Sequence, residues 1–162
     1  MIEIIKASEK NIADIESILL EAEMWLESIG KPLWEREWLT WDSLSKEFEI
    51  GDFYIALTDG APAGCMAVID HDPEIWPDIK KGASLFIHRL AVKRAAAKKG
   101  IPDALIHHAK KMCAERGIDT LRLDCHGLMP RLRAVYERNG FKCVGEGKIF
   151  KIYDIAYYEY KI

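Results

Sequence analysis

Hydrophobic and polar residues follow one another along the chain with two different periods, and the period distinguishes strands from helices. Near the N-terminus the run IEIIKAS favours a short β-strand. Ile15, Leu19, Ala22 and Leu26 then follow at steps of four, three and four residues, which is typical of one face of an amphipathic helix. Gly30 comes directly after this stretch and predicts the end of the helix.

A second helical stretch, PLWEREWLTWDSLSKEF, is expected to start at Pro32, because proline suits the first turn of a helix. Trp34, Trp38 and Trp41 would then share one helical face. Rings at this spacing are more often core residues than binding residues, and we favour the core for Trp38 and Trp41. Trp34 follows the Gly-Lys-Pro turn and is the tryptophan best placed for a binding pocket.

The middle of the chain predicts a hairpin followed by a β-α-β unit. Two β-prone runs are joined by Asp59-Gly60, a common hairpin turn, and a polar loop with two prolines follows over residues 72–81. A strongly β-prone run, SLFIHRLAV, covers residues 84–92, and a helix is expected over residues 102–116. With the strand TLRLDC, this region favours a right-handed crossover between two parallel strands.

A short helix beginning at Pro130 and two final strands complete the predicted order β-α-α-β-β-β-α-β-α-β-β. Hairpins on either side of one parallel crossover predict an α/β fold. Its sheet would be mixed and mostly antiparallel, with about six to seven strands and helices on both faces. The chain has no repeat, low-complexity tract or linker, so we expect a single domain over residues 1–162.

Composition and charge exclude several classes of function. The formal net charge of -3 argues against broad binding to nucleic acid, which requires a basic surface. No apolar run approaches the roughly 20 residues that span a membrane, and the N-terminus has no signal-peptide pattern, so we expect a cytoplasmic protein. Cys65, Cys113, Cys125 and Cys143 are far apart and form no CxxC pair, which predicts free thiols and no metal.

Two motifs at a fixed spacing carry a family resemblance. The run RLAV at residues 89–92 is followed by a loop, a helix and the strand LRLDC, and then by YERNGF at residues 136–141. The chain thereby resembles the GNAT superfamily of acyl-CoA-dependent N-acetyltransferases over nearly all of its length. The resemblance implies acetyl-CoA as co-substrate and an amine as acceptor, with direct attack in a ternary complex.

The resemblance also identifies a loop for the pyrophosphate of the donor, with one notable departure. The family pattern Q/R-x-x-G-x-G/A falls on residues 97–102, where only Gly100 matches, because Ala97 and Pro102 replace the other two positions. Backbone amides and the dipole at a helix start hold such an anion, and proline supplies no amide. Lys98 and Lys99 add compensating charge, whereas Asp103 is adverse if it points inward; an ordinary strand-to-helix turn is the alternative.

The resemblance further implies that the backbone of the strand around residues 90–92 pairs with the pantetheine arm, and that a bulge there presents an amide to the thioester carbonyl. The expected cofactor-binding residues are Leu90, Ala91, Val92, Lys98, Lys99, Gly100, Ile101 and Asp103.

Acetyl transfer also needs side chains that move protons. Tyr136 matches the tyrosine with which the family commonly protonates the CoA thiolate, although helical spacing with Leu132 and Val135 equally suits a core aromatic. His88 is a candidate base, because imidazole takes a proton near neutral pH. His126 is the other candidate for the base. Alternatively, His126 binds the substrate, a role for which Trp34 is also a candidate. Asp124 ends a parallel strand, where it is as suited to a structural hydrogen bond as to an active role.

The acceptor is expected to be the amine of a small molecule or a peptide. Aromatic side chains next to acidic residues in the stretch after Gly30 would suit a cationic amine with an apolar body. A homodimer is possible through pairing of the C-terminal YYEYKI. The alternative function is a binding or sensing module of the same fold with weak or no turnover, which the altered loop at Ala97 and Pro102 favours.

Overall fold

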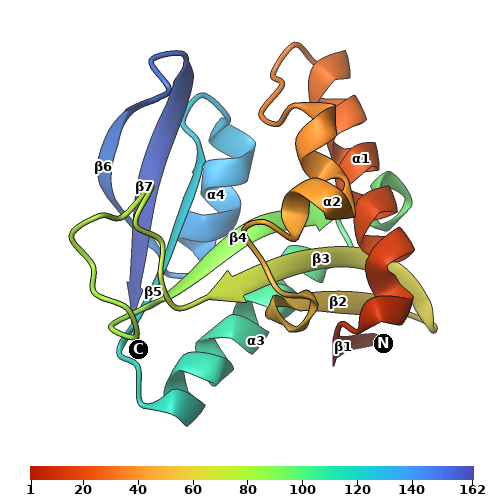
Figure 1. Ribbon diagram of the computed structural model, residues 1–162, viewed down its shortest axis with the longest axis horizontal. Coiled ribbons are helices and arrows are strands. Elements are labelled where there is room, and N and C mark those ends of the chain that lie inside the picture. Colours follow the sequence, from red (N-terminus) through yellow and green to blue (C-terminus); the bar gives the residue numbers. More distant parts are fainter. The chain divides into compact units, whose positions relative to one another are not determined.

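The computed structural model describes residues 1–162 and has the order of strands and helices that the hydrophobic pattern predicts (Figure 1). The strands are β1 (Ile2–Lys6), β2 (Phe53–Thr58), β3 (Ala61–Ile69), β4 (Leu85–Val92), β5 (Thr120–His126), β6 (Lys142–Ile149) and β7 (Tyr153–Lys161). The helices are α1 (Ile12–Ser28), α2 (Trp41–Leu44), α3 (Ile101–Arg116) and α4 (Pro130–Arg138). None of these helices is both long and apolar enough to cross a membrane.

All strands belong to one seven-stranded sheet with the order β1-β2-β3-β4-β5-β7-β6. Strands β4 and β5 pair in parallel through Leu85–Ile87 and Leu121–Leu123, and α3 connects them. The other strand pairs are antiparallel. The predicted α/β class and the mixed, mostly antiparallel sheet around one parallel pair are therefore confirmed.

The chain divides into two compact units, which are described separately. The first unit comprises Met1–Ala67 and Arg89–Leu105, and the second comprises Val68–His88 and Ile106–Ile162. Each unit therefore contains two segments that are far apart in the sequence. The single domain expected over residues 1–162 stays a prediction.

In the first unit, β1, β2 and β3 form an antiparallel meander beneath α1 (Figure 1). Of the predicted buried face of α1, Ile15, Leu19 and Leu26 are buried and Ala22 is only half-buried. Ile18 and Glu23 are buried in addition. The β2–β3 turn is at Asp59-Gly60, where both residues have positive φ, 49° and 81°. The predicted hairpin turn is thus confirmed.

The segment after α1 corrects the prediction of a continuous second helix. A 3-10 turn covers Arg36–Leu39, and the short α2 begins only after Thr40, whose backbone is extended and whose hydroxyl accepts a hydrogen bond from the Ser43 amide. Carboxylates of α1 bind two amides of this segment, with Oε2 of Glu23 3.1 Å from Trp34 N and Oε2 of Glu16 2.8 Å from Trp41 N. These long-range hydrogen bonds take the place of hydrogen bonds within a helix. The periodicity of the sequence does not reveal them.

The three tryptophans consequently do not share a helical face. Trp34 lies before the 3-10 turn, and Trp38 is exposed, so the core position favoured for Trp38 is wrong. The Trp41 ring packs edge-on against Phe53 in β2, with ring centroids 6.1 Å apart.

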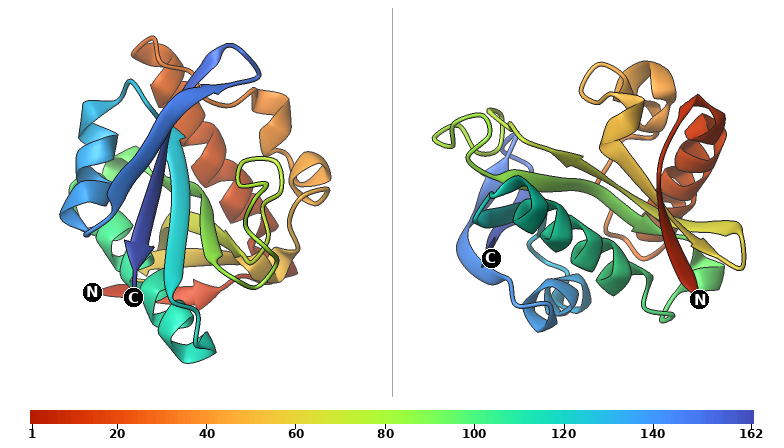
Figure 2. Two further views of the ribbon diagram at one scale, coloured as in Figure 1. Left: turned by 90° about the vertical axis from the view of Figure 1, so that its left-hand side faces the viewer. Right: turned by 90° about the horizontal axis from the view of Figure 1, so that it is seen from below.

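In the second unit, β5, β7 and β6 lie side by side, with α4 on one face and the loop between β3 and β4 on the other (Figure 2). Neighbouring residues of β7 point to opposite faces. Tyr157 therefore meets Trp76 of that loop, at 5.3 Å between ring centroids, while Tyr158 meets Tyr136 of α4, at 6.1 Å. The second unit thus has an apolar layer on each side of these strands.

Candidate active site

The segment between β4 and α3 ends in a helix N-terminus whose amides make no hydrogen bond to a backbone carbonyl. Gly100 is the N-terminal cap of α3, because its carbonyl accepts a hydrogen bond from Ala104 N at 3.1 Å. No backbone carbonyl accepts a hydrogen bond from the amides of residues 98–101. Lys98 and Gly100 have positive φ, 62° and 80°, so the chain turns sharply here. The predicted amides at the start of α3 are present.

Proline occupies a slightly different position from the one expected. Ile101 is the first residue of α3, so Pro102 is the second and Asp103 the third. Proline is compatible with the first helical turn but supplies no N–H there. The side chains of Lys98 and Lys99 are exposed, and Ile101 is completely buried. The loop therefore presents amides and two ammonium groups while its hydrophobic end is anchored in the core.

Close packing against β3 and α1 holds this loop. A Cβ atom at Gly64 would lie 2.7 Å from Cγ2 of Ile101 and 2.8 Å from the carbonyl oxygen of Ala91. Before the loop, the Arg94 amide donates a hydrogen bond to Oε2 of Glu21 at 2.8 Å. The Arg94 guanidinium lies 4.1 Å from the centre of the Trp25 ring. The loop thus has defined contacts to the elements beside it.

Strand β4 has a distorted backbone immediately after His88. Arg89 has a φ of 52°, in the left-handed region, which costs a non-glycine residue on the order of 1 kcal/mol. The parallel pairing with β5 ends at Ile87, two residues earlier. Such an interruption changes the direction of the backbone amides that follow. The strand bulge that the resemblance implies around residues 90–92 stays a prediction.

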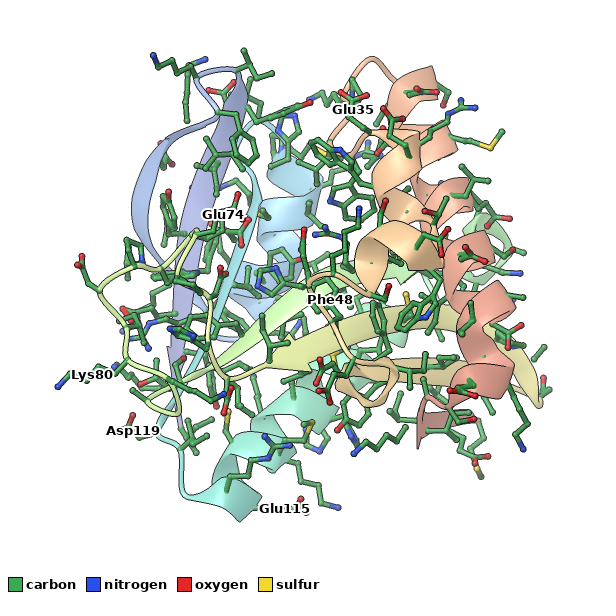
Figure 3. All side chains as sticks on the ribbon, in the orientation of Figure 1. Glu35, Phe48, Glu74, Lys80, Glu115 and Asp119 are labelled. Atoms are coloured by element: carbon green, nitrogen blue, oxygen red, sulfur yellow. The ribbon has the colours of Figure 1, made fainter.

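The side chain of Arg89 makes contacts that the sequence did not predict. Its guanidinium lies 5.7 Å from the Trp34 ring centre and 5.6 Å from that of Phe48, which Figure 3 labels. Nη2 of Arg89 is 3.6 Å from Oε2 of Glu47. One face of Trp34 is therefore covered by a cation of the protein itself, which leaves less room there for a cationic acceptor.

Tyr136 is buried in α4, with only 4% of its surface exposed. Its ring contacts Phe141 and Tyr158, both at 6.1 Å between centroids. Burial raises the pKa of the phenol, and the nearby Cys125, Asp124 and Tyr158 raise it further. The hydroxyl therefore keeps its proton at neutral pH, as an acid must, while the ring packs like a core residue.

A partly exposed polar network that was not predicted holds α4 to β7. The Tyr158 hydroxyl donates to Oε1 of Glu137 and accepts from Nε of Arg133, both at 2.8 Å. Arg133 also donates to the Gly127 carbonyl at 3.1 Å and pairs with Oε1 of Glu146 at 2.7 Å. Together these bonds fix the helix that carries Tyr136.

Two carboxylates of the second unit lie close to His88. Nε2 of His88 lies 2.9 Å from Oδ2 of Asp72, and one carboxylate oxygen of Asp124 lies within 4.8 Å of both groups. Asp72 is buried, with 6% exposed, whereas Glu74 and Lys80 of the same loop are exposed (Figure 3). The sequence brought forward His88 and Asp124 but not Asp72, which lies 16 positions before His88 in a polar loop.

His126 has a local hydrogen bond in the turn that follows β5. Its Nδ1 accepts a hydrogen bond from Leu128 N at 3.1 Å, and only 9% of the residue is exposed. The Met129 amide donates to the His126 carbonyl at 3.3 Å. These contacts give His126 a role in shaping the turn, and its predicted role toward substrate stays a prediction.

The comparisons with known proteins agree with this geometry. The model of the acetyltransferase (GNAT) family matches residues 10–141. This chain belongs to the GNAT acetyltransferase family. A relative from Bacillus subtilis (strain 168), described as uncharacterized N-acetyltransferase YesJ, is 24% identical over 137 residues, which cover 81% of this chain and 76% of the relative.

Two solved structures show the same fold as the GNAT chain. A GNAT-family acetyltransferase from Listeria monocytogenes superposes with a TM-score of 0.77 at 24% identity, covering 99% of this chain and 95% of the other. The PaiA N-acetyltransferase from Thermoplasma acidophilum, solved in complex with coenzyme A, also gives 0.77, at 21% identity and with 100% and 99% coverage. At these identities the likeness supports the fold.

Proposed function

We propose that the protein is an N-acetyltransferase that moves the acetyl group of acetyl-CoA to a primary amine of a small molecule or peptide. Attack is direct, in a ternary complex. The observation that carries the proposal is the start of α3, where no backbone carbonyl accepts a hydrogen bond from the amides of residues 98–101, in the loop that follows strand β4 with its distorted backbone at Arg89. Family membership supplies the reaction class.

The donor-binding residues fit this role. The amides of Lys98, Lys99, Gly100 and Ile101 and the dipole of the 16-residue α3 suit a pyrophosphate. The lysine ammonium groups supply the positive charge that Ala97 does not. Pro102 removes one amide, and the Asp103 carboxylate competes for the same positive end of the helix.

The strand before the loop would hold the pantetheine arm through its backbone. Leu90, Ala91 and Val92 follow the point at which β4 and β5 cease to pair. Their polar backbone groups suit the amides of pantetheine, and the bulge at Arg89 turns an amide toward the thioester oxygen in this proposal. When bound, acetyl-CoA supplies an activated acetyl group. All the other roles belong to residues of this chain.

Proton transfers are assigned to two side chains. His88 takes a proton from the acceptor ammonium, because only a neutral amine has the lone pair that attacks a carbonyl. Tyr136 gives its proton to the leaving thiolate, since a phenol is protonated at neutral pH. Trp34 and His126 are proposed to contact the acceptor.

Ligand-dependent melting tests the proposal, with acetyl-CoA and free CoA added separately. The protein should be stabilised by both, by about 3 kcal/mol when the ligand is at one hundred times its Kd. A panel of primary amines is then assayed for thiol release. Donor binding without turnover on any amine would favour the sensing module that Ala97 and Pro102 leave open. Absence of binding at millimolar donor would contradict the acetyltransferase and leave the sensing module as the better explanation.

A further inference from the structure

We propose that Asp72 is the positioning residue for the base His88, and that Asp124 supplies a second carboxylate beside the imidazole. The inference deepens the proposed function and rests on it for the identity of the reaction. Asp72 acts through His88, because its own carboxylate is buried.

The loop between β3 and β4 is built to hold Asp72 in place. The Asp72 carbonyl accepts a hydrogen bond from Trp76 N at 2.8 Å, and its Oδ1 accepts one from Ile75 N at 3.2 Å, so Asp72 closes a turn. The Trp76 ring packs on Phe86 of β4, at 6.2 Å between centroids, and on Tyr157 of β7. The aromatic contacts thereby fix the turn against the face of the sheet that carries His88.

The positions of the three groups follow from strand alternation. Phe86 pairs with Arg122 in the parallel register, and the next residue on the same face of each strand is His88 and Asp124. The guanidinium of Arg122 lies 5.6 Å from the Trp76 ring centre, which shows that this face is the one under the loop. The register thus places His88 of β4 next to Asp124 of β5, on the face that the loop with Asp72 covers.

Oδ2 of Asp72 can accept a hydrogen bond that it does not receive. The atom is buried and accepts no aligned hydrogen bond, although Nε2 of His88 lies 2.9 Å away. A buried carboxylate oxygen without a donor is unfavourable by about 1–3 kcal/mol or more. A small rotation of the imidazole that directs Nε2–H at Oδ2 removes this penalty. The tautomer with hydrogen on Nε2 leaves Nδ1 as the basic nitrogen.

The charges favour a proton on the imidazole once it is transferred. Asp72 from the loop and Asp124 from β5 both place a carboxylate beside His88. In the proton transfer, an N–H bond of the acceptor ammonium breaks, its electron pair stays on nitrogen, and the proton forms a new bond to Nδ1. The imidazolium then lies next to two carboxylates, and Asp72 holds it without taking the proton, as in other base–carboxylate pairs.

The test compares Asp72→Asn with Asp70→Asn, a matched control in the same loop whose carboxylate pairs with Lys81 at the surface. Asp72→Asn should lower kcat on the order of 10- to 100-fold with the KM for acetyl-CoA unchanged, and should move the low-pH limb of the rate profile to lower pH. Asp70→Asn should change neither quantity. A folded Asp72→Asn protein with unchanged kcat and pH profile would overturn the proposal.

An NMR titration of the His88 ring provides a readout that needs no turnover. The midpoint of ring protonation should fall in Asp72→Asn and in Asp124→Asn relative to the wild type. If the wild type acetylates no amine but the midpoints fall, the proposed function fails while the Asp72–His88 pairing stands. Unchanged midpoints overturn the pairing, as does loss of wild-type activity to a chelator with recovery on adding Zn²⁺, which would show that the three groups ligate a metal.

Discussion

Gly64 of β3 lies so close to Ile101 of α3 that a methyl group does not fit between them: its Cβ would be 2.7 Å from Cγ2 of Ile101. The same Cβ would be 2.8 Å from the Ala91 carbonyl oxygen, a backbone atom that cannot move away by a change of rotamer. Because Gly64 has no side chain, Ile101, the first residue of α3, can pack directly against β3. Both residues belong to the first unit.

Gly64→Ala should consequently destabilise the protein by about 1–3 kcal/mol, because it overpacks a core contact. Urea unfolding measures the change. Gly147→Ala in β6 is the matched control, since a Cβ there meets no atom within 4 Å, and it should stay within about 0.5 kcal/mol of the wild type. Equal stability of the two variants would mean that Gly64 does not set this contact.

Tyr136→Phe tests the assigned acid. It keeps the ring that packs on Phe141 and Tyr158 and removes only the hydroxyl. We expect kcat to fall by about 10- to 100-fold while the Kd for acetyl-CoA changes little, because the proton is needed only by the leaving thiolate. Tyr160→Phe, also in the second unit, is the control. Full turnover in Tyr136→Phe would show that this tyrosine has only a structural role.

Replacing Lys98 and Lys99 together by alanine tests the loop as a phosphate site. The exposed ammonium groups should contribute mainly electrostatic attraction, so the KM for acetyl-CoA should rise by about 10-fold and its dependence on salt should weaken. The kcat should change little. Lys80→Ala with Lys81→Ala, an exposed lysine pair in the second unit, should leave the KM as it is. If both double variants raised the KM for acetyl-CoA equally, the cause would be the overall charge of the protein and not the loop.

Glu23 gives the protein a pH-dependent stability. Burial raises the pKa of this carboxyl above its usual range, although the Trp34 and Leu33 amides lower it in part. Between the ordinary value, about 4.3, and the raised one, the folded chain holds more protons than the unfolded chain, so the free energy of unfolding falls as the pH rises. Glu23→Gln should remove this slope and be more stable than the wild type at neutral pH.

Unfolding in urea at several pH values between about 4 and 8 checks the effect. The difference between Glu23→Gln and the wild type should shrink toward the acid end, where the wild-type carboxyl is protonated in both states. Glu37→Gln, at an exposed position, is the control and should follow the wild type. A slope that persists in Glu23→Gln would assign the pH dependence to another group.

The sequence predicts the fold well where the hydrophobic period is local. The helical spacing from Ile15 to Leu26, the Asp59-Gly60 turn and Pro130 at the start of α4 are each a local signal, and each prediction is confirmed. The second helix fails because the Trp34 and Trp41 amides bind carboxylates of α1, a long-range contact without a periodic signature.

For the candidate site, motifs of contiguous residues bring forward Tyr136 and the amides before α3, whose roles stay predictions. No such motif brings forward Asp72, because a loop carboxylate becomes significant only once Trp76 packs on Phe86 and brings it to His88. The Arg89 side chain between Trp34 and Phe48 is equally non-local, since three separate segments of the first unit meet there.

We propose that the loop before α3 binds the donor and that the protein transfers the acetyl group of the donor to an amine. The most direct measurement is thiol release from acetyl-CoA across a panel of primary amines, with mass spectrometry of the acceptor. The account predicts an acceptor heavier by one acetyl group, with one thiol released for each acetyl transferred, and greatly reduced turnover in Tyr136→Phe. No acetylated amine from a protein saturated with acetyl-CoA would contradict it.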